Sequence, residues 1–215
     1  MTKEMILQKV CGLNVQFESY KNWENLVEML KQDIRDENNK RNGNGKIAKL
    51  ANAILKSAKQ NYSYNDHKHN RLEYSKIIDG VQYVLDGHRI AGFYEKLDLP
   101  EWTETEDWFN AKDFVDKLEF SDEPVNLPDI VEFKAAITKA KAHKKKPVFV
   151  TESGTILNAH FIMDALQGFG NGAKMYESME RQTVNPVMIE SDAGFCIILP
   201  ICNRENLGPG FHEIY

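Results

Sequence analysis

Two stretches of the chain combine a helical apolar stripe with a run of basic residues that contains no acid. Residues 40–60 carry six basic residues and residues 134–146 carry six lysines, although the net charge of the whole chain is −5. Apolar residues at helical spacing predict an amphipathic helix in each stretch, with the lysines on the other side. The apolar stripes consist of Ile47, Leu50, Ile54 and Ala58 in the first, and of Ile130, Phe133 and Ile137 in the second.

The basic residues of these helices have two interpretations. Lysines on a solvated helix face are common and need no partner. A phosphate backbone responds to local charge, so two helices without acids also fit a nucleic-acid-binding face on an acidic protein. Residues 95–129 hold twelve acids and three bases, which concentrates the negative charge elsewhere. The candidate DNA contacts are Lys46, Lys49, Lys56, Lys59, Lys134, Lys139, Lys141 and Lys145.

Length and composition exclude several classes of protein. The 215 residues are 42% hydrophobic and 27% charged, which is typical of a globular chain of one to two domains and excludes disorder and a disulfide scaffold. Cys11, Cys196 and Cys202 are sparse and odd in number, so we expect reduced thiols. No window approaches the ~18 apolar residues of a membrane span. The N-terminus lacks the apolar core of a signal peptide, so a cytoplasmic protein without a membrane partner is expected.

Each basic helix is followed, further along the chain, by a segment with an asparagine in its second position. Residues 109–118 and 157–166 share the order apolar, Asn, Ala, two variable residues, two apolar residues, Asp, one variable residue and Leu. Asn110 and Asn158 can cap a helix, because the side-chain oxygen accepts from an orphan amide of the first turn. The order of basic helix and capped helix occurs twice and predicts two related units. They are residues 1–123, with an N-terminal extension, and the shorter 124–215, with a C-terminal tail.

Strand patterns lie between and after these helices. Asp79-Gly80 and the run 191–194 are turn sequences between apolar runs, and each predicts a β-hairpin. The sequence therefore predicts an α+β fold with antiparallel sheets. The expected strands are 6–17, 72–78, 81–85, 90–95, 147–151, 174–178, 186–190 and 194–201, and a further helix is expected at 23–35.

Four runs of the sequence, at residues 84–91, 157–170, 185–189 and 197–201, together resemble the bacterial sliding clamp, the β subunit of DNA polymerase III. Val84-Leu-Asp-Gly-His-Arg-Ile-Ala91 resembles a strand motif of its middle domain. Residues 157–170, 185–189 and 197–201 resemble the capped helix and closing strands of its last domain. The resemblance covers roughly residues 44–118 and 130–202. It implies a DNA-clamp-like fold, with two helices packed on antiparallel sheet in each of two repeated units. The family has three domains per chain, whereas this chain has room for two.

The resemblance also implies a function without covalent chemistry. A sliding-clamp-like processivity factor would encircle or contact duplex DNA non-specifically, as lysines contact phosphates without reading bases. It would bind short peptide motifs of a polymerase or other replication proteins, and a closed six-domain ring would need three chains. The implied peptide pocket has Gly87, His88, Arg89 and Ile90 on one wall and Ile197, Leu199, Pro200 and Ile201 on the other. The alternative is a monomeric clamp-like protein-binding module of a phage or mobile element.

The residues alone leave other roles open. Ile197, Leu199 and Ile201 also fit plain strand core, and His88 fits a hydrogen-bonded turn beside Asp86-Gly87. Asp66, His67 and His69 could hold a metal, but no second cluster has ligand spacing. Cys196 and Cys202 have no clear histidine partner, and no nucleotide-binding or zincin motif occurs. We therefore expect no enzyme activity, metal or cofactor.

Overall fold

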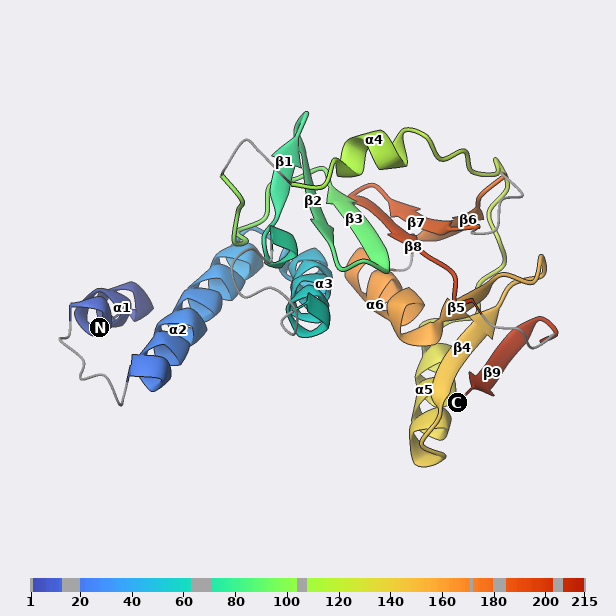
Figure 1. Ribbon diagram of the computed structural model, residues 1–215, viewed down its shortest axis with the longest axis horizontal. Coiled ribbons are helices and arrows are strands. Elements are labelled where there is room, and N and C mark those ends of the chain that lie inside the picture. The colour runs from blue at the N-terminus through green and yellow to red at the C-terminus, as the bar shows by residue number, and fades with distance from the viewer. Residues whose placement is uncertain are drawn as a thin grey trace.

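The protein is described by a computed structural model that covers residues 2–12, 20–62, 71–103, 108–170, 172–179, 185–202 and 207–214 (Figure 1). Its helices are α1 (Lys3–Cys11), α2 (Tyr20–Arg41), α3 (Gly45–Tyr62), α4 (Ala111–Val115), α5 (Ile130–Ala142) and α6 (Ala159–Phe169), with a 3-10 turn, η2 (Arg71–Glu73). Its strands are β1 (Lys76–Ile78), β2 (Val81–Leu85), β3 (Arg89–Phe93), β4 (Lys146–Val150), β5 (Ile156–Asn158), β6 (Lys174–Glu177), β7 (Val187–Ser191), β8 (Gly194–Ile198) and β9 (Gly210–Ile214).

A six-stranded antiparallel sheet forms the centre of the molecule. Its strand order is β1-β2-β3-β8-β7-β6, and β3 and β8 pair in the middle, with Arg89 opposite Ile198 and Phe93 opposite Gly194. Helix α3 packs on β2, and α6 packs on β7 and β8 beside α3. Each of these helices precedes a three-stranded meander, and the two meanders join at the β3–β8 pair. The fold thus repeats the order of one helix and three strands within one sheet.

This repeat differs from the one that the sequence predicts. The predicted units 1–123 and 124–215 each contribute three strands to the same sheet and share its largest apolar core. The basic stretch 40–60 was expected to match 134–146, but the topology matches α3 with α6. The reason is that α3 and α6 both lie on the six-stranded sheet, whereas α5 packs on β4.

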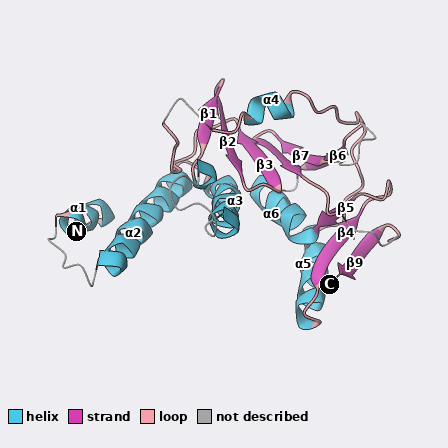
Figure 2. Ribbon diagram, viewed as in Figure 1, coloured by secondary structure: helices cyan, strands magenta, loops and turns pink. Residues whose placement is uncertain are grey.

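A smaller sheet, of order β5-β4-β9, carries α5 (Figure 2). Phe133 of α5, Phe149 of β4 and Phe211 of β9 form an aromatic cluster with ring centroids 4.9 to 5.5 Å apart. Strand β9 comes from the tail for which the sequence predicts no element. It forms because β4 offers a pairing edge and α5 offers Phe133 as a packing partner.

The outer face of the six-stranded sheet is covered by α4 and the residues around it. The apolar residues of this face alternate along the strands with those that face the helices, and they pack against Ala111 of α4. They are Tyr83, Leu85, Ile90, Phe195 and Ile197. Further along the chain, Val125 donates its backbone N–H to Met175, so residues 119–125 lie along the outer edge of β6. Phe120 and Val125 form isolated bridges with Ser178 and Met175 in this stretch.

Helices α1 and α2 project from the body as a helical hairpin (Figure 1). The predicted strand 6–17 is wrong over residues 6–11, which belong to α1; residues 13–17 lie outside the described part. Thr2 caps α1 by accepting from the Met5 amide, and Lys3 pairs with Glu37 of α2 at 2.8 Å. Packing against α2 therefore selects the helix over the strand.

The two predicted hairpins and the α+β class are confirmed. Strands β1 and β2 pair around Asp79-Gly80, and β7 and β8 pair around residues 191–194. Asn110 and Asn158 cap α4 and α6, as predicted, by accepting from the backbone amides of Asp113 and His160. Within the described ranges, every helix is too short or too polar to cross a bilayer.

Candidate nucleic-acid and peptide interfaces

The lysines of α3 lie on its solvent side. Its apolar stripe, with Leu50 and Ile54, is buried against the sheet and α6. Lys59 approaches Glu73 at 3.9 Å, while no salt bridge joins the other three lysines to another described residue. The predicted DNA contacts that α3 exposes are Lys46, Lys49, Lys56 and Lys59.

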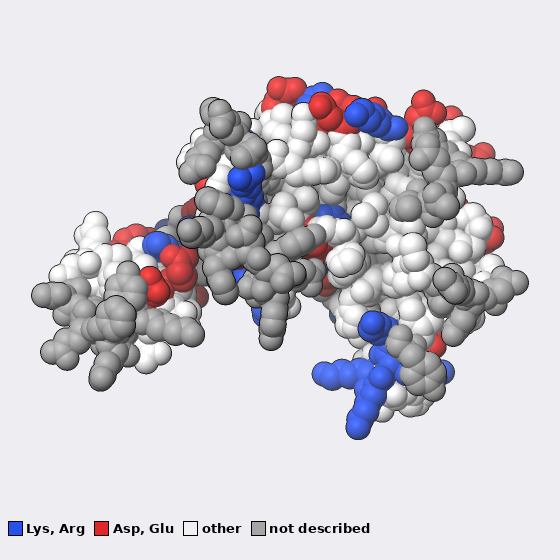
Figure 3. Space-filling view, viewed as in Figure 1, with Lys and Arg blue, Asp and Glu red and all other residues white. Residues whose placement is uncertain are grey.

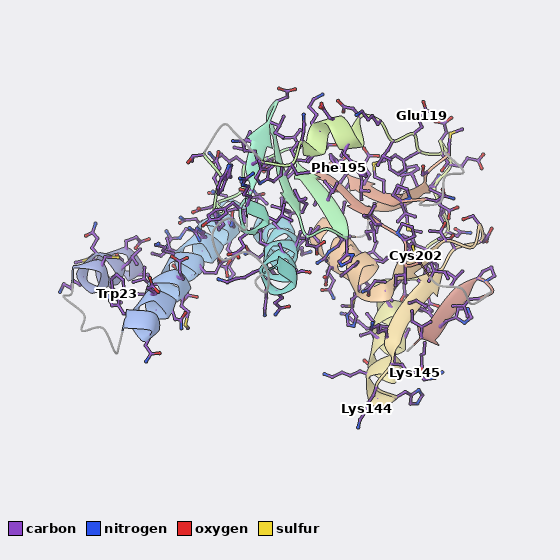
Figure 4. All side chains as sticks on the ribbon, in the orientation of Figure 1. Trp23, Glu119, Lys144, Lys145, Phe195 and Cys202 are labelled. Carbon is purple, nitrogen blue, oxygen red and sulfur yellow. The ribbon has the colours of Figure 1, made fainter. Side chains whose placement is uncertain are left out.

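The lysines of α5 flank its outermost face. Lys134, Lys139 and Lys141 are exposed, and Lys145 is half-buried just after the helix. Lysine and arginine side chains gather at the free end of α5 (Figure 3), where Lys144 and Lys145 lie (Figure 4). A hydrogen bond connects this end of α5 to β9, with His143 Nδ1 2.8 Å from Glu213 Oε2. That hydrogen bond lowers the pKa of the Glu213 carboxyl below its ordinary value.

The two basic helices lie on either side of α6. Helix α6 packs against both α3 and α5, and the three helices lie on the same side of the six-stranded sheet (Figure 1). The sequence of α6 contains no lysine or arginine and a single acid, Asp164. The helix side of the molecule therefore presents two rows of lysines separated by a helix with little charge.

The Asp-Gly-His-Arg motif forms a buried ion network. Asp86 is 0% exposed and Arg89 2% exposed, and Asp86 Oδ2 accepts from Arg89 Nε at 3.0 Å and Nη2 at 2.8 Å. Asp86 Oδ1 also accepts from the amides of His88 and Arg89. Arg89 Nη1 donates to Asp164 Oδ2 at 3.0 Å, and the Phe161 ring lies 4.1 Å from the guanidinium carbon. The motif thus ties the β2–β3 turn to α6.

The two walls of the predicted peptide pocket meet in part. Leu199 donates its amide to the His88 carbonyl at 2.9 Å, which brings Gly87 and His88 beside Leu199 and Pro200. His88 is exposed, and its ring stacks on Phe161 with centroids 6.2 Å apart.

The other pocket candidates lie in packed surroundings. Ile90 and Ile197 are buried in the core under α4, and Arg89 faces α6. Ile201 packs with the core of the three-stranded sheet and donates its amide to Ile156. The strand-core interpretation thus describes Ile197, whereas Ile201 is half-buried beyond the end of β8. Of the other candidates, Gly87 and His88 are exposed, and Leu199 and Pro200 are half-buried.

Phe161 and Asp164 are the partners of the motif that sequence reasoning missed. They lie three residues apart on α6, so their side chains share one face of that helix. In the sequence, an aromatic residue and an acid beside the apolar face of a capped helix only weakly indicate that the two side chains contact a distant arginine. Arg89 is 75 residues away from Asp164, and only the fold brings them together.

A hollow of about 450 Å³ lies where α6 ends beside β6 and β7, and the sequence did not predict it. Phe169 and Tyr176 give it apolar surface, and Lys174, Glu190 and Asp192 place charges of both signs around it. The charges suit a polar ligand of mixed character but select no chemical class.

The histidines and cysteines considered for metal binding or catalysis show no such site in the described part of the chain. Asp66, His67 and His69 lie outside the described residues. Elsewhere, across the described ranges, no three His, Cys, Asp or Glu side chains cluster as metal ligands. Cys196 is buried in β8, and burial raises the pKa of its thiol to about 12, whereas Cys11 and Cys202 are exposed. Cys196 is thus a core residue with an inert thiol.

Comparison with protein-family models, with curated proteins and with solved structures finds no match to this chain. Its function must therefore follow from its own residues and geometry.

Proposed function

We propose that this protein is a sliding-clamp-like processivity factor that contacts duplex DNA non-specifically through α3 and α5. The observation that carries the proposal is the pair of lysine rows on one side of the central sheet, on either side of α6. Lysines act on phosphates as point charges and read no sequence, which suits contact that must be kept while the protein moves along DNA.

The arrangement of the resembling segments supports the same proposal. The clamp resemblance implies two helices packed on antiparallel sheet in each of two repeated units; here α3 and α6, one from each predicted unit, pack side by side on a single antiparallel sheet. Residues 84–91 and 197–201, two of the runs that resemble the clamp, meet at the hydrogen bond between Leu199 and His88. Gly87, His88, Leu199 and Pro200 would then contact short peptide motifs of replication proteins. Encirclement of DNA requires several copies, and the trimeric ring stays a prediction.

Charge reversal of the lysine rows tests the DNA contact. Fluorescence anisotropy of a labelled duplex should show binding at low salt that weakens steeply as salt is added. Lys46→Glu/Lys49→Glu and Lys134→Glu/Lys141→Glu should each weaken binding and lower the slope of log affinity against log salt by about 2, at ~0.9 per phosphate contact. Lys117→Glu/Lys174→Glu changes the charge equally at exposed sites outside α3 and α5, and it should bind as the unaltered protein does.

Two results would contradict the DNA contact. The first is no binding at low salt, and the second is an equal loss in the Lys117/Lys174 control. The first result favours the alternative, a monomeric clamp-like protein-binding module. The observation that favours this alternative is the exposed His88 ring on Phe161, beside half-buried Leu199 and Pro200.

A further inference from the structure

The hollow at the end of α6 is bordered by three charged side chains that do not neutralise one another. Lys174 begins β6, Glu190 lies near the end of β7, and Asp192 is in the turn that follows. Lys174 and Glu190 are opposite each other in the β6–β7 register, where opposite charges commonly pair. Within the described ranges, however, no salt bridge joins any of the three to another side chain. Their charges are therefore available to a ligand.

Two aromatic rings and a glycine shape the same hollow. Phe169, the last residue of α6, packs on Phe93 of the core with ring centroids 6.4 Å apart, so the core fixes its position. Tyr176 follows Lys174 by two residues on β6, so both side chains lie on the same face of the strand. At Gly172 a Cβ atom would have no neighbour within 4 Å, so the backbone leaves open space. The volume of about 450 Å³ suits a small molecule.

The charges select a class of ligand when they are counted and combined with the two rings. The hollow has one base and two acids, so a complementary ligand carries one anionic group and two cationic groups. A planar guanidinium also stacks on an aromatic face and donates two parallel hydrogen bonds to a carboxylate. A free amino acid with a basic side chain has all of these groups, namely an α-carboxylate, an α-ammonium and a side-chain cation.

We propose that this hollow binds a free basic amino acid, for which arginine is the best match. The α-carboxylate of the ligand contacts Lys174, and its two cationic groups contact Glu190 and Asp192. The guanidinium plane lies against the aromatic surface that Phe169 and Tyr176 provide. The inference is separate from DNA binding, because every residue that borders the hollow lies outside α3 and α5.

The test is a titration of the protein with L-arginine, followed by the amide chemical shifts in nuclear magnetic resonance spectra. The amides of Gly172 and Ala193, which border the hollow, should shift in a saturable way with a Kd of about 1 mM or tighter. Three analogues each lack one charge: L-citrulline lacks the side-chain cation, agmatine lacks the carboxylate, and Nα-acetyl-L-arginine lacks the ammonium. Each should bind about tenfold more weakly, because one charged side chain of the hollow is left without its partner.

Variants of the protein match each charge of the hollow to a group of the ligand. Lys174→Gln should weaken the binding of L-arginine about tenfold but should not weaken that of agmatine, which has no carboxylate to lose. Glu190→Gln and Asp192→Asn should each weaken L-arginine by a similar factor. Lys117→Gln and Glu123→Gln make the same changes at exposed residues outside the hollow, and these controls should bind as the unaltered protein does. All five positions are exposed or half-buried, so the midpoint of thermal unfolding should stay the same.

Any of four results overturns the proposal. They are the absence of saturable shifts at Gly172 and Ala193, equal affinity for L-arginine and its analogues, an equal loss in the Lys117 and Glu123 controls, and an equal loss of L-arginine and agmatine in Lys174→Gln. The last result would show that Lys174 does not contact the carboxylate. The anisotropy assay with duplex DNA contains no amino acid ligand, so it reports on the proposed function independently of this one.

Discussion

Arg89 shows how one buried residue can hold two parts of a fold together. Its guanidinium is paired with Asp86 on its own turn and with Asp164 on α6. Arg89→Met would leave Asp86 buried without its cation, and we expect a loss of about 3–5 kcal/mol in the free energy of unfolding. Asp164→Asn removes a charge from a group that is 29% exposed, so its cost should be about 1 kcal/mol or less. Urea denaturation measures both values.

The double variant Asp86→Asn/Arg89→Met separates pairing from packing. Removing both charges leaves no ion in the core, so it should be more stable than Arg89→Met alone, as expected for a replaced buried ion pair. Equal stability of Arg89→Met and Asp164→Asn would show that the buried pair contributes little. The sequence placed Arg89 in a peptide pocket because of its motif, whereas its closest contacts are to the protein itself.

The contact between α3 and α6 depends on a glycine. A Cβ atom at Gly168 would lie 2.8 Å from Leu50 Cβ, which is closer than such atoms normally approach. Alanine is normally better than glycine in a helix by about 1 kcal/mol, but here overpacking should reverse the sign. We expect Gly168→Ala to lower stability by about 1–3 kcal/mol in thermal or chemical unfolding.

Two further variants provide the controls for Gly168. A Cβ atom at Gly172 would have no neighbour within 4 Å, so Gly172→Ala should leave stability nearly unchanged. Leu50→Ala removes the Cδ2 and Cγ atoms that the new methyl group would meet at 3.0 and 3.5 Å but keeps Cβ, so the added cost of Gly168→Ala should become smaller in that background without vanishing. A Gly168→Ala protein that is more stable than the parent would mean that the two helices pack less closely than described.

The sequence predicted an element well where neighbouring residues determine it, as in a hairpin turn. It predicted an element less well where contact with a distant part of the chain determines it. Asp79-Gly80 and residues 191–194 marked hairpins because a turn needs only neighbouring residues. Residues 6–11 suit a strand or a helix, and α2 decides between them. Residues 210–214 become β9 only by pairing with β4, sixty or more residues earlier in the chain. The capped pattern at 109–118 gave a helix of only five residues, α4.

At the scale of the whole molecule, the sequence predicted the class and misassigned the repeat. Two helices with lysines on one face look alike in sequence, and nothing in either pattern states which sheet it will cover. The pairing of β3 with β8 joins residues about a hundred positions apart, and this pairing merges the predicted units into one sheet. The lysine faces were predicted from the sequence because helical periodicity alone determines which side of α3 is solvated.

The shared sheet predicts that residues 1–123 and 124–215 unfold together. All three tryptophans, Trp23, Trp102 and Trp108, lie in the first range, so their fluorescence reports on that half, while far-ultraviolet circular dichroism reports on the whole chain. In urea the two signals should have the same midpoint, as expected for one cooperative unit. Trp23→Phe removes the probe in the projecting hairpin, and the midpoints should still coincide. If the fluorescence midpoint differs in that variant, the halves unfold independently, and the β3–β8 pair contributes too little to couple them.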